Sequence, residues 1–174
     1  MIGVSFMGRE HNKQQGQGGP RQGGHQGEPR SSSALAKFKQ LIQTKGFTDD
    51  EVMKLSEELG KSLIGASQSR GEREGKEDTK TQVRKFYNLV RVANISASAP
   101  DAAPETIKVK LRTLQAQVAY ARGRKTIGDE FKEFFDASLN KVIGSDDLKK
   151  SLGEFATFFE SLYAYFYYHT EVKR

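Results

Sequence analysis

The sequence contains no cysteine and no tryptophan, and its 174 residues include only four prolines. Without cysteine the chain cannot form disulfides, thiolate metal sites or a cysteine nucleophile, and their absence fits a reducing cytosol. No apolar run approaches the roughly 18 residues that a membrane-spanning helix requires. The first residues lack the basic and apolar regions of a signal peptide. These absences predict a soluble, cytoplasmic protein with no membrane partner.

The sequence also lacks the residue constellations of an enzyme. Its three histidines, His11, His25 and His169, do not have metal-ligand spacing. No nucleophile motif, phosphate-binding loop or dinucleotide glycine pattern occurs. Acidic clusters such as Asp49-Asp50-Glu51 fall at the starts of predicted helices, where the helix dipole explains them. We therefore expect no catalytic residue, no metal and no cofactor.

The positive charge is concentrated in one part of the chain. Lysine and arginine exceed aspartate and glutamate by 28 to 22, which gives a net charge of +6. Residues 80–125 carry 10 basic side chains and 2 acidic ones, whereas residues 126–174 carry 6 basic and 9 acidic ones. Such asymmetry suggests a polyanionic partner, and a solvated helix face is the other interpretation that the charges leave open.

Composition divides the chain into four segments. Residues 1–33 are rich in Gly and Gln and have too little apolar surface to bury, which predicts a disordered leader. Residues 34–64 predict a helical pair, too small to hold a core alone. Residues 65–79 are almost without apolar side chains and predict a polar linker. Residues 80–174 predict a helical bundle.

The periodicity of the apolar residues predicts helices and no strands. In the helical pair, apolar side chains recur every three or four residues on both sides of Gly46, which ends the first helix. Thr48 and Glu51 have the spacing of a capping box, which predicts the start of the second helix. No segment alternates with period two over the length of a strand. The predicted fold class is therefore all-α.

Four amphipathic helices are expected in the bundle, which makes a compact fold of about four to six helices in all. The first three are predicted over 80–94, 104–123 and 127–143, and Ser145 is the expected cap of the fourth. Most of the eleven phenylalanines lie in the last two helices, so these helices should supply most of the core.

Aromatic residues also lie outside the main apolar stripe of the last helix. They are Phe158, Tyr163, Tyr165, Tyr167 and Tyr168. Two interpretations are open: the last helix is central to the bundle, or its outer aromatic residues contact another subunit.

Basic residues of the first two bundle helices form the candidate binding site. Lys80, Arg84 and Arg91 share one face of the first helix, while Lys85 points elsewhere. Guanidinium groups along a helix can bridge successive phosphates with paired hydrogen bonds. The predicted RNA-binding residues are Lys80, Arg84, Lys85, Arg91, Lys108, Arg112, Arg122, Arg124 and Lys125.

These cations come without a motif that reads bases. The sequence has no recognition-helix signature, no RNA-recognition aromatic motif and no zinc finger. We therefore expect contact with a nucleic-acid backbone and little sequence preference. We also expect the cations of the two helices to merge into one continuous ridge.

Three segments resemble a known family. Residues 81–87 (TQVRKFY), 114–124 (LQAQVAYARGR) and 155–165 (FATFFESLYAY) are similar to motifs of the small helical subunit of type III-A CRISPR effector complexes. They occur in the order that the family shows. The sequence departs from the family pattern at Gln117, where lysine is expected, and at Ala116, where proline is expected.

The resemblance implies a non-catalytic subunit. Several copies would associate with one another and stack along the complex, beside the other subunits, where guide RNA and target RNA pair. Arg84, Lys85 and Arg124 match the family motifs, while Arg112 or Arg122 would replace the lysine missing at position 117.

An adaptor function is the alternative that the residues leave open. In that interpretation the aromatic last helix docks a protein partner, and the basic face meets an acidic protein. A nuclease is a third hypothesis, which would depend on a carboxylate or on His169.

Overall fold

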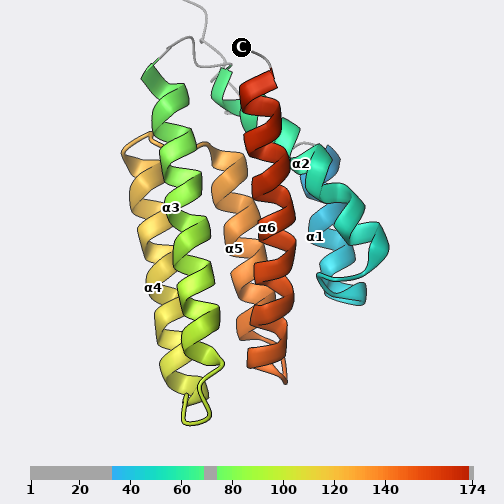
Figure 1. Ribbon diagram of the computed structural model, residues 1–174, viewed down its shortest axis with the longest axis vertical. Helices are drawn as coiled ribbons and strands as arrows, with labels where there is room; N and C mark the ends of the chain where they lie inside the picture. The colour runs from blue at the N-terminus through green and yellow to red at the C-terminus, as the bar shows by residue number, and fades with distance from the viewer. Residues whose placement is uncertain (1–32, 69–73, 173–174) are drawn as a thin grey trace, which may run out of the picture.

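The computed structural model describes residues 33–68 and 74–172, and these residues form six helices and no strand (Figure 1). The all-α prediction is therefore confirmed for this part of the chain. The predicted leader, apart from residue 33, lies outside the described residues. The helices are α1 (Ser33–Lys45), α2 (Asp50–Gln68), α3 (Glu74–Ala97), α4 (Pro104–Gly123), α5 (Asp129–Ile143) and α6 (Leu148–Val172).

The segment 65–79, predicted as a linker, is helical at both of its ends. The second helix continues to Gln68, and the third begins at Glu74, six positions before the predicted start at Lys80. Four of the residues 74–80, EGKEDTK, are lysine or glutamate, which have good helix propensity. A count of apolar residues misses such helix ends, because they extend beyond the packed core.

The second helix begins with a different cap from the one predicted. The Asp49 carboxylate accepts the backbone N–H of Glu51 at 2.9 Å, so Asp49, and not Thr48, is the capping residue. The Glu51 side chain does not complete a capping box but pairs with Lys45 at 2.8 Å. This ion pair links the end of α1 to the start of α2.

The start of α6 shows the same kind of correction. The Asp147 carboxylate accepts the backbone N–H of Lys150 at 2.9 Å, whereas Ser145, the predicted cap, donates its hydroxyl to the Asp147 carbonyl. Aspartate is as good a cap as serine and sits closer to the first helical turn. Pro104 takes the first position of α4, as predicted.

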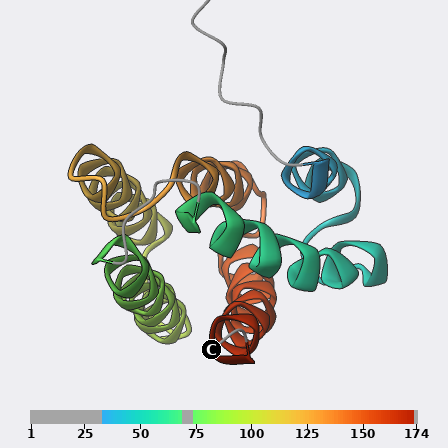
Figure 2. The same cartoon turned by 90° about the horizontal axis from the view of Figure 1, so that it is seen from above.

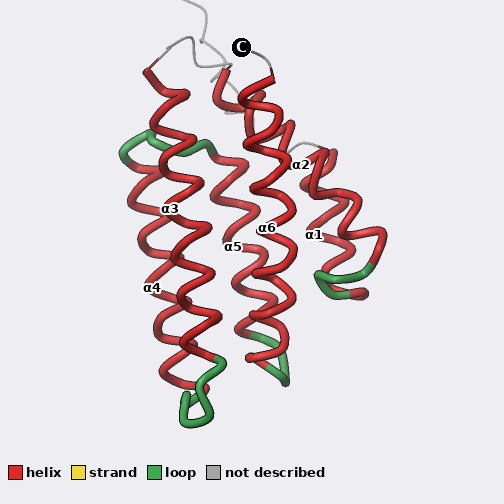
Figure 3. Tube along the Cα trace, viewed as in Figure 1, coloured by secondary structure: helices red, strands yellow, loops and turns green. Residues whose placement is uncertain are grey.

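Helices α3, α4, α5 and α6 run alongside one another, and α1 and α2 cover one side of this bundle (Figures 1 and 2). Helix α3 packs against α4 and α6, and α4 packs against α5. Loops are confined to the helix ends (Figure 3). Helix α6 contacts α2, α3 and α5 and is therefore central to the fold. Phe158 is buried, whereas Tyr165, Tyr167 and Tyr168 are exposed, so a contact of these tyrosines with another subunit stays a prediction.

Phenylalanine rings of α5 and α6 form the centre of the core. Phe134 and Phe159 lie 5.6 Å apart between ring centroids, and Phe155 stacks on Phe159 at 5.7 Å. The helical pair joins this cluster through Phe38, which stacks on Phe158 at 4.9 Å. Thus α1 and α2 share one core with the bundle, and the aromatic residues predicted to dominate the core do so.

Helices α2 and α6 approach each other closely at Gly60. A methyl group at Gly60 would lie 2.9 Å from the backbone nitrogen of Phe166 and 3.3 Å from the carbonyl oxygen of Leu162. These are backbone atoms of a helix, which cannot rotate away as a flexible side chain can. The α2 and α6 packing therefore requires glycine at this position.

We predict that Gly60→Ala lowers the free energy of unfolding by about 1 to 2 kcal/mol, because overpacking outweighs the gain in helix propensity. Gly123→Ala is the matched control, since no atom lies within 4 Å of its added methyl group. Denaturant unfolding of both variants checks the prediction. Equal stability of the two variants would contradict the assigned close contact.

Candidate nucleic-acid interface

The predicted basic residues lie on α3, on α4 and on the turn that follows α4. Six of the nine are exposed: Arg84, Lys85 and Arg91 on α3, and Arg112, Arg124 and Lys125 on α4 and just beyond its end. Helices α3 and α4 lie next to each other along their lengths (Figure 1). The other three residues have partners that limit what they can bind.

Lys80 is tied to the last helix. Its ammonium forms an ion pair with Glu171 and lies 4.6 Å from the centroid of the Tyr167 ring. Both partners belong to α6, so this contact fastens α3 to the C-terminal part of the chain. Because the charge of Lys80 is already matched by a carboxylate, its role in the structure is first of all to join two helices.

Arg122 is held by the start of α5. Its guanidinium donates two hydrogen bonds to Asp129, from Nε to Oδ1 and from Nη2 to Oδ2, the latter at 2.7 Å. The hydrogen bond that Arg122 donates to Asp129 raises the pKa of Arg122, against the opposing effect of burial. This paired geometry joins the end of α4 to the next helix, and it neutralises the charge of Arg122.

Lys108 and Arg112 differ in the charge of their partners. Lys108 pairs with Glu105 at 3.0 Å within α4. Arg112 donates to the side-chain oxygens of Gln115 and Asn140, at 2.9 and 3.1 Å. Since both of these partners are neutral amides, Arg112 is held in place while its positive charge stays uncompensated.

The expected single ridge across α3 and α4 is not what the structure shows. Lys80 bonds to α6, whereas Arg112 and Arg122 bond to α5. Seen from above, α3 lies beside α6 and α4 lies beside α5 (Figure 2). The cations therefore spread over both flanks of the α3 and α4 pair. Helical spacing alone had placed them on defined faces, but the positions of the neighbouring helices decide where those faces point.

A shallow hollow of about 360 Å³ lies on the outer face of α3. Arg84, Lys85 and Asn88 line it together with Val92, which is 59% exposed. Two cations and an amide beside an apolar side chain suit the alternation of phosphate and sugar along a nucleic-acid backbone.

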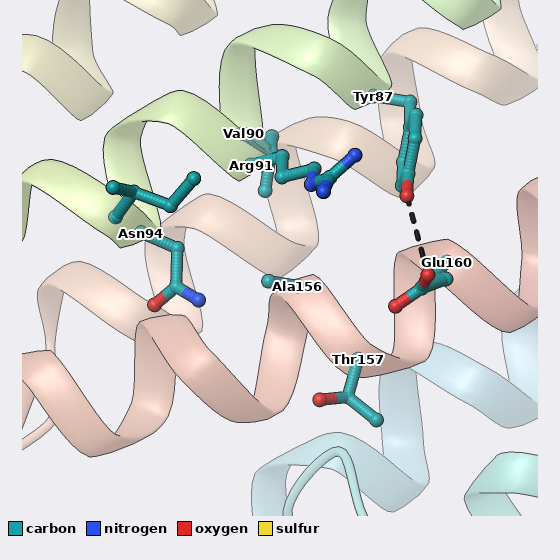
Figure 4. Close-up of a pocket in the computed structure, with 8 residues that line it drawn as sticks. Tyr87, Val90, Arg91, Asn94, Ala156, Thr157 and Glu160 are labelled. Carbon is teal, nitrogen blue, oxygen red and sulfur yellow. Dashed lines mark hydrogen bonds between the residues drawn. The ribbon is translucent and has the colours of Figure 1, made fainter.

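A second hollow of about 250 Å³ lies between α3 and α6 (Figure 4). Arg91 and Asn94 face it from α3, and Thr157 and Glu160 line it from α6. The Tyr87 hydroxyl donates to Glu160 across the hollow at 3.4 Å. Burial first, and the nearby Glu160 carboxylate second, raise the pKa of Tyr87, so its hydroxyl keeps its proton.

Sequence reasoning missed exposed residues on the same two helices. Lys110 is an exposed cation of α4 within the basic stretch, and its charge was the signal that could have identified it. Ile95, Val109 and Tyr120 are 64%, 66% and 67% exposed. These residues could have been recognised as exposed because they lie outside the periodic apolar stripes of α3 and α4. Seven exposed basic residues lie on α3, on α4 and on the turn after α4, and we call them the exposed cations. They are Arg84, Lys85, Arg91, Lys110, Arg112, Arg124 and Lys125.

No group of three or more His, Cys, Asp or Glu residues that could hold a metal ion occurs among residues 33–68 and 74–172. Within the same residues, every helix is too short or too polar to cross a lipid bilayer.

One comparison with known proteins gave a match. A family model described as Csm2 Type III-A matches residues 50–171. The matched region runs from the start of α2 almost to the end of α6 and includes all nine predicted RNA-binding residues. Curated proteins and solved structures gave no match.

We predict that Arg122 acts as a structural residue, unlike Arg112. Replacing Arg122 by alanine should lower the free energy of unfolding by about 0.5 to 1 kcal/mol, the range of partly exposed ion pairs. Arg112→Ala, which removes the same charge from the same helix, should leave stability nearly unchanged. Thermal unfolding, combined with Asp129→Asn in a double-mutant cycle, measures the coupling. A coupling energy of zero would show that the pair adds nothing to stability.

Proposed function

Since the chain belongs to the Csm2 family, the small subunits of type III-A CRISPR complexes, we propose that it is a non-catalytic subunit that binds RNA in such a complex. In this function the exposed cations contact the sugar-phosphate backbone of guide and target RNA without reading sequence. Several copies stack along the complex beside the other subunits. In this proposal the subunit binds RNA, stacks with further copies of itself and acts in the cytoplasm.

The observation that supports RNA binding is the position of the exposed cations. All seven lie on α3, on α4 or on the turn after α4. Residues 80–125 contain two acidic side chains, Asp101 and Glu105. Ion pairs occupy Lys80, Lys108 and Arg122. Residues 80–125 therefore keep an excess of positive charge, which a polyanion would balance.

The spread of the cations over two flanks favours a particular mode of contact. A flat duplex face would meet one flank at a time, whereas an RNA strand that curves around the α3 and α4 edge could meet both. Arg124, whose guanidinium lies 5.8 Å from the Tyr120 ring centroid, would provide a cationic and aromatic contact at the end of this edge.

A helical adaptor remains the second candidate function. Ile95, Val109 and Tyr168 are each more than half exposed, and apolar side chains at such exposure suit contacts with protein subunits. The two functions are compatible in a subunit that sits between RNA and other proteins. They differ in whether binding to a partner survives nuclease treatment.

We predict that Arg84→Ala combined with Arg124→Ala weakens binding of single-stranded RNA. The slope of log affinity against log salt should fall by about 1.4, because each phosphate contact on a single strand contributes about 0.7. Fluorescence anisotropy of labelled RNA over a range of salt concentrations measures this slope.

The matched control is Lys37→Ala combined with Lys150→Ala, which removes the same total charge from two exposed lysines on α1 and α6. This control should leave most of the slope unchanged. Equal slopes for the two double variants would mean that net charge alone, and not the α3 and α4 surface, determines binding.

A further inference from the structure

The hollow between α3 and α6 has a composition unlike the rest of the basic surface. Tyr87 and Glu160 lie at one end and Asn94 at the other, with Arg91 between them on the α3 side (Figure 4). Tyr87 and Asn94 are two helical turns apart, which makes the hollow about 10 Å long. Its volume of about 250 Å³ and this length are large enough for one planar heterocycle.

Small residues of α6 create the space. Ala156 lines the hollow, and a methyl group added at Gly153 would lie 3.6 Å from the Asn94 side-chain oxygen. The two helices therefore approach closely at Gly153 and leave room next to it. Ala156 is partly buried against the core, and a larger side chain at this position would extend into that room.

The charges of the hollow do not suit a phosphate. Glu160 is exposed and would repel an anion placed beside Arg91. Among the described residues Arg91 has no hydrogen bond and no ion pair, so its donors are available. A guanidinium, a carboxylate and an amide around one space fit a neutral ligand that carries both donors and acceptors on its edges.

The aromatic ring at the end of the hollow adds a stacking surface. Tyr87 stacks on Tyr163 with ring centroids 4.7 Å apart and planes only 10° apart. In Figure 4 the Tyr87 ring is seen edge-on, with one face turned toward Arg91. A planar heterocycle in the hollow would lie against this face and continue the stack of two rings.

We propose that this hollow binds a guanine base of single-stranded RNA. Guanine presents two neighbouring donors, N1–H and the N2 amino group, which a carboxylate such as Glu160 can accept together. Its O6 and N7 acceptors suit the paired donors of Arg91. Uracil, cytosine and adenine each offer no more than one donor group on the corresponding edge, so the carboxylate distinguishes guanine from them.

This inference rests on the proposed RNA binding but adds a base preference to it: Arg91 contacts a base, while the other exposed cations contact the backbone. The test measures binding of the full chain to oligouridine and to an oligomer of equal length with guanosine at every third position. The protein should bind the guanosine oligomer about tenfold more tightly. Inosine in place of guanosine lacks the N2 amino group and should remove most of this preference. An oligomer with adenosine at these positions should bind no more tightly than oligouridine.

Glu160→Gln should abolish the preference for guanosine while its affinity for oligouridine stays equal or rises, because one negative charge is removed. Ala156→Leu, which fills the hollow, should have the same effect on preference. Glu58→Gln removes an exposed carboxylate from α2 and is the matched control, which should keep the preference.

The outcomes separate the two proposals. Equal binding of guanosine and uridine oligomers by the unmodified protein, or a full preference in Glu160→Gln, would overturn the guanine site and leave backbone binding intact. Binding of neither oligomer would overturn the proposed RNA-binding function as well.

Discussion

The contact between the phenylalanine rings of α5 and α6 is the interaction on which the other helices depend. Phe134, Phe155 and Phe159 are fully buried and lie within about one ring diameter of one another. Phe38 brings α1 to this cluster, and Phe86 brings α3 to it through Phe131 and Phe135. Aromatic side chains bury large areas and have few rotatable bonds, so they fix the relative positions of helices at a low cost in conformational entropy.

The position of this cluster explains why α3 and α4 are available for binding. Each of these helices buries one apolar stripe and is covered by the remaining helices on that side only. Ion pairs to α6 and α5, made by Lys80 and Arg122, fasten the two helices near their ends. The exposed cations Arg84, Lys85, Arg91, Lys110 and Arg112 therefore lie on helices that are packed against the core, and such a preorganised support lowers the entropic cost of binding.

The sequence predicted the helices better than their ends. Apolar periodicity is set by the core, so it identified α1 to α6, but the caps depend on which of several competent neighbours occupies the capping position. For that reason the caps of α2 and α6 are Asp49 and Asp147 and not the predicted Thr48 and Ser145. The helical residues 65–68 and 74–79 contain no apolar residue apart from Ala66, which is why they were assigned to a linker.

The candidate site could be predicted in its residue types and only partly in its geometry. The basic stretch and the family resemblance both pointed to α3 and α4, and the assignment of the site to these helices stays a prediction. The pairing of Lys80 could not be foreseen, because Glu171 lies 91 positions further along the chain. The same holds for the hollow beside Tyr87, which needs α6 to lie next to α3 with small residues at Gly153 and Ala156.

Photo-crosslinking of the full chain to RNA that contains 4-thiouridine tests most directly whether RNA lies on α3 and α4. Digestion of the crosslinked protein and mass spectrometry identify the peptides that touch RNA. The structure predicts crosslinks to peptides from residues 81–95 and 108–125, on both flanks of the α3 and α4 edge. Crosslinks confined to α1 and α2 would contradict the account.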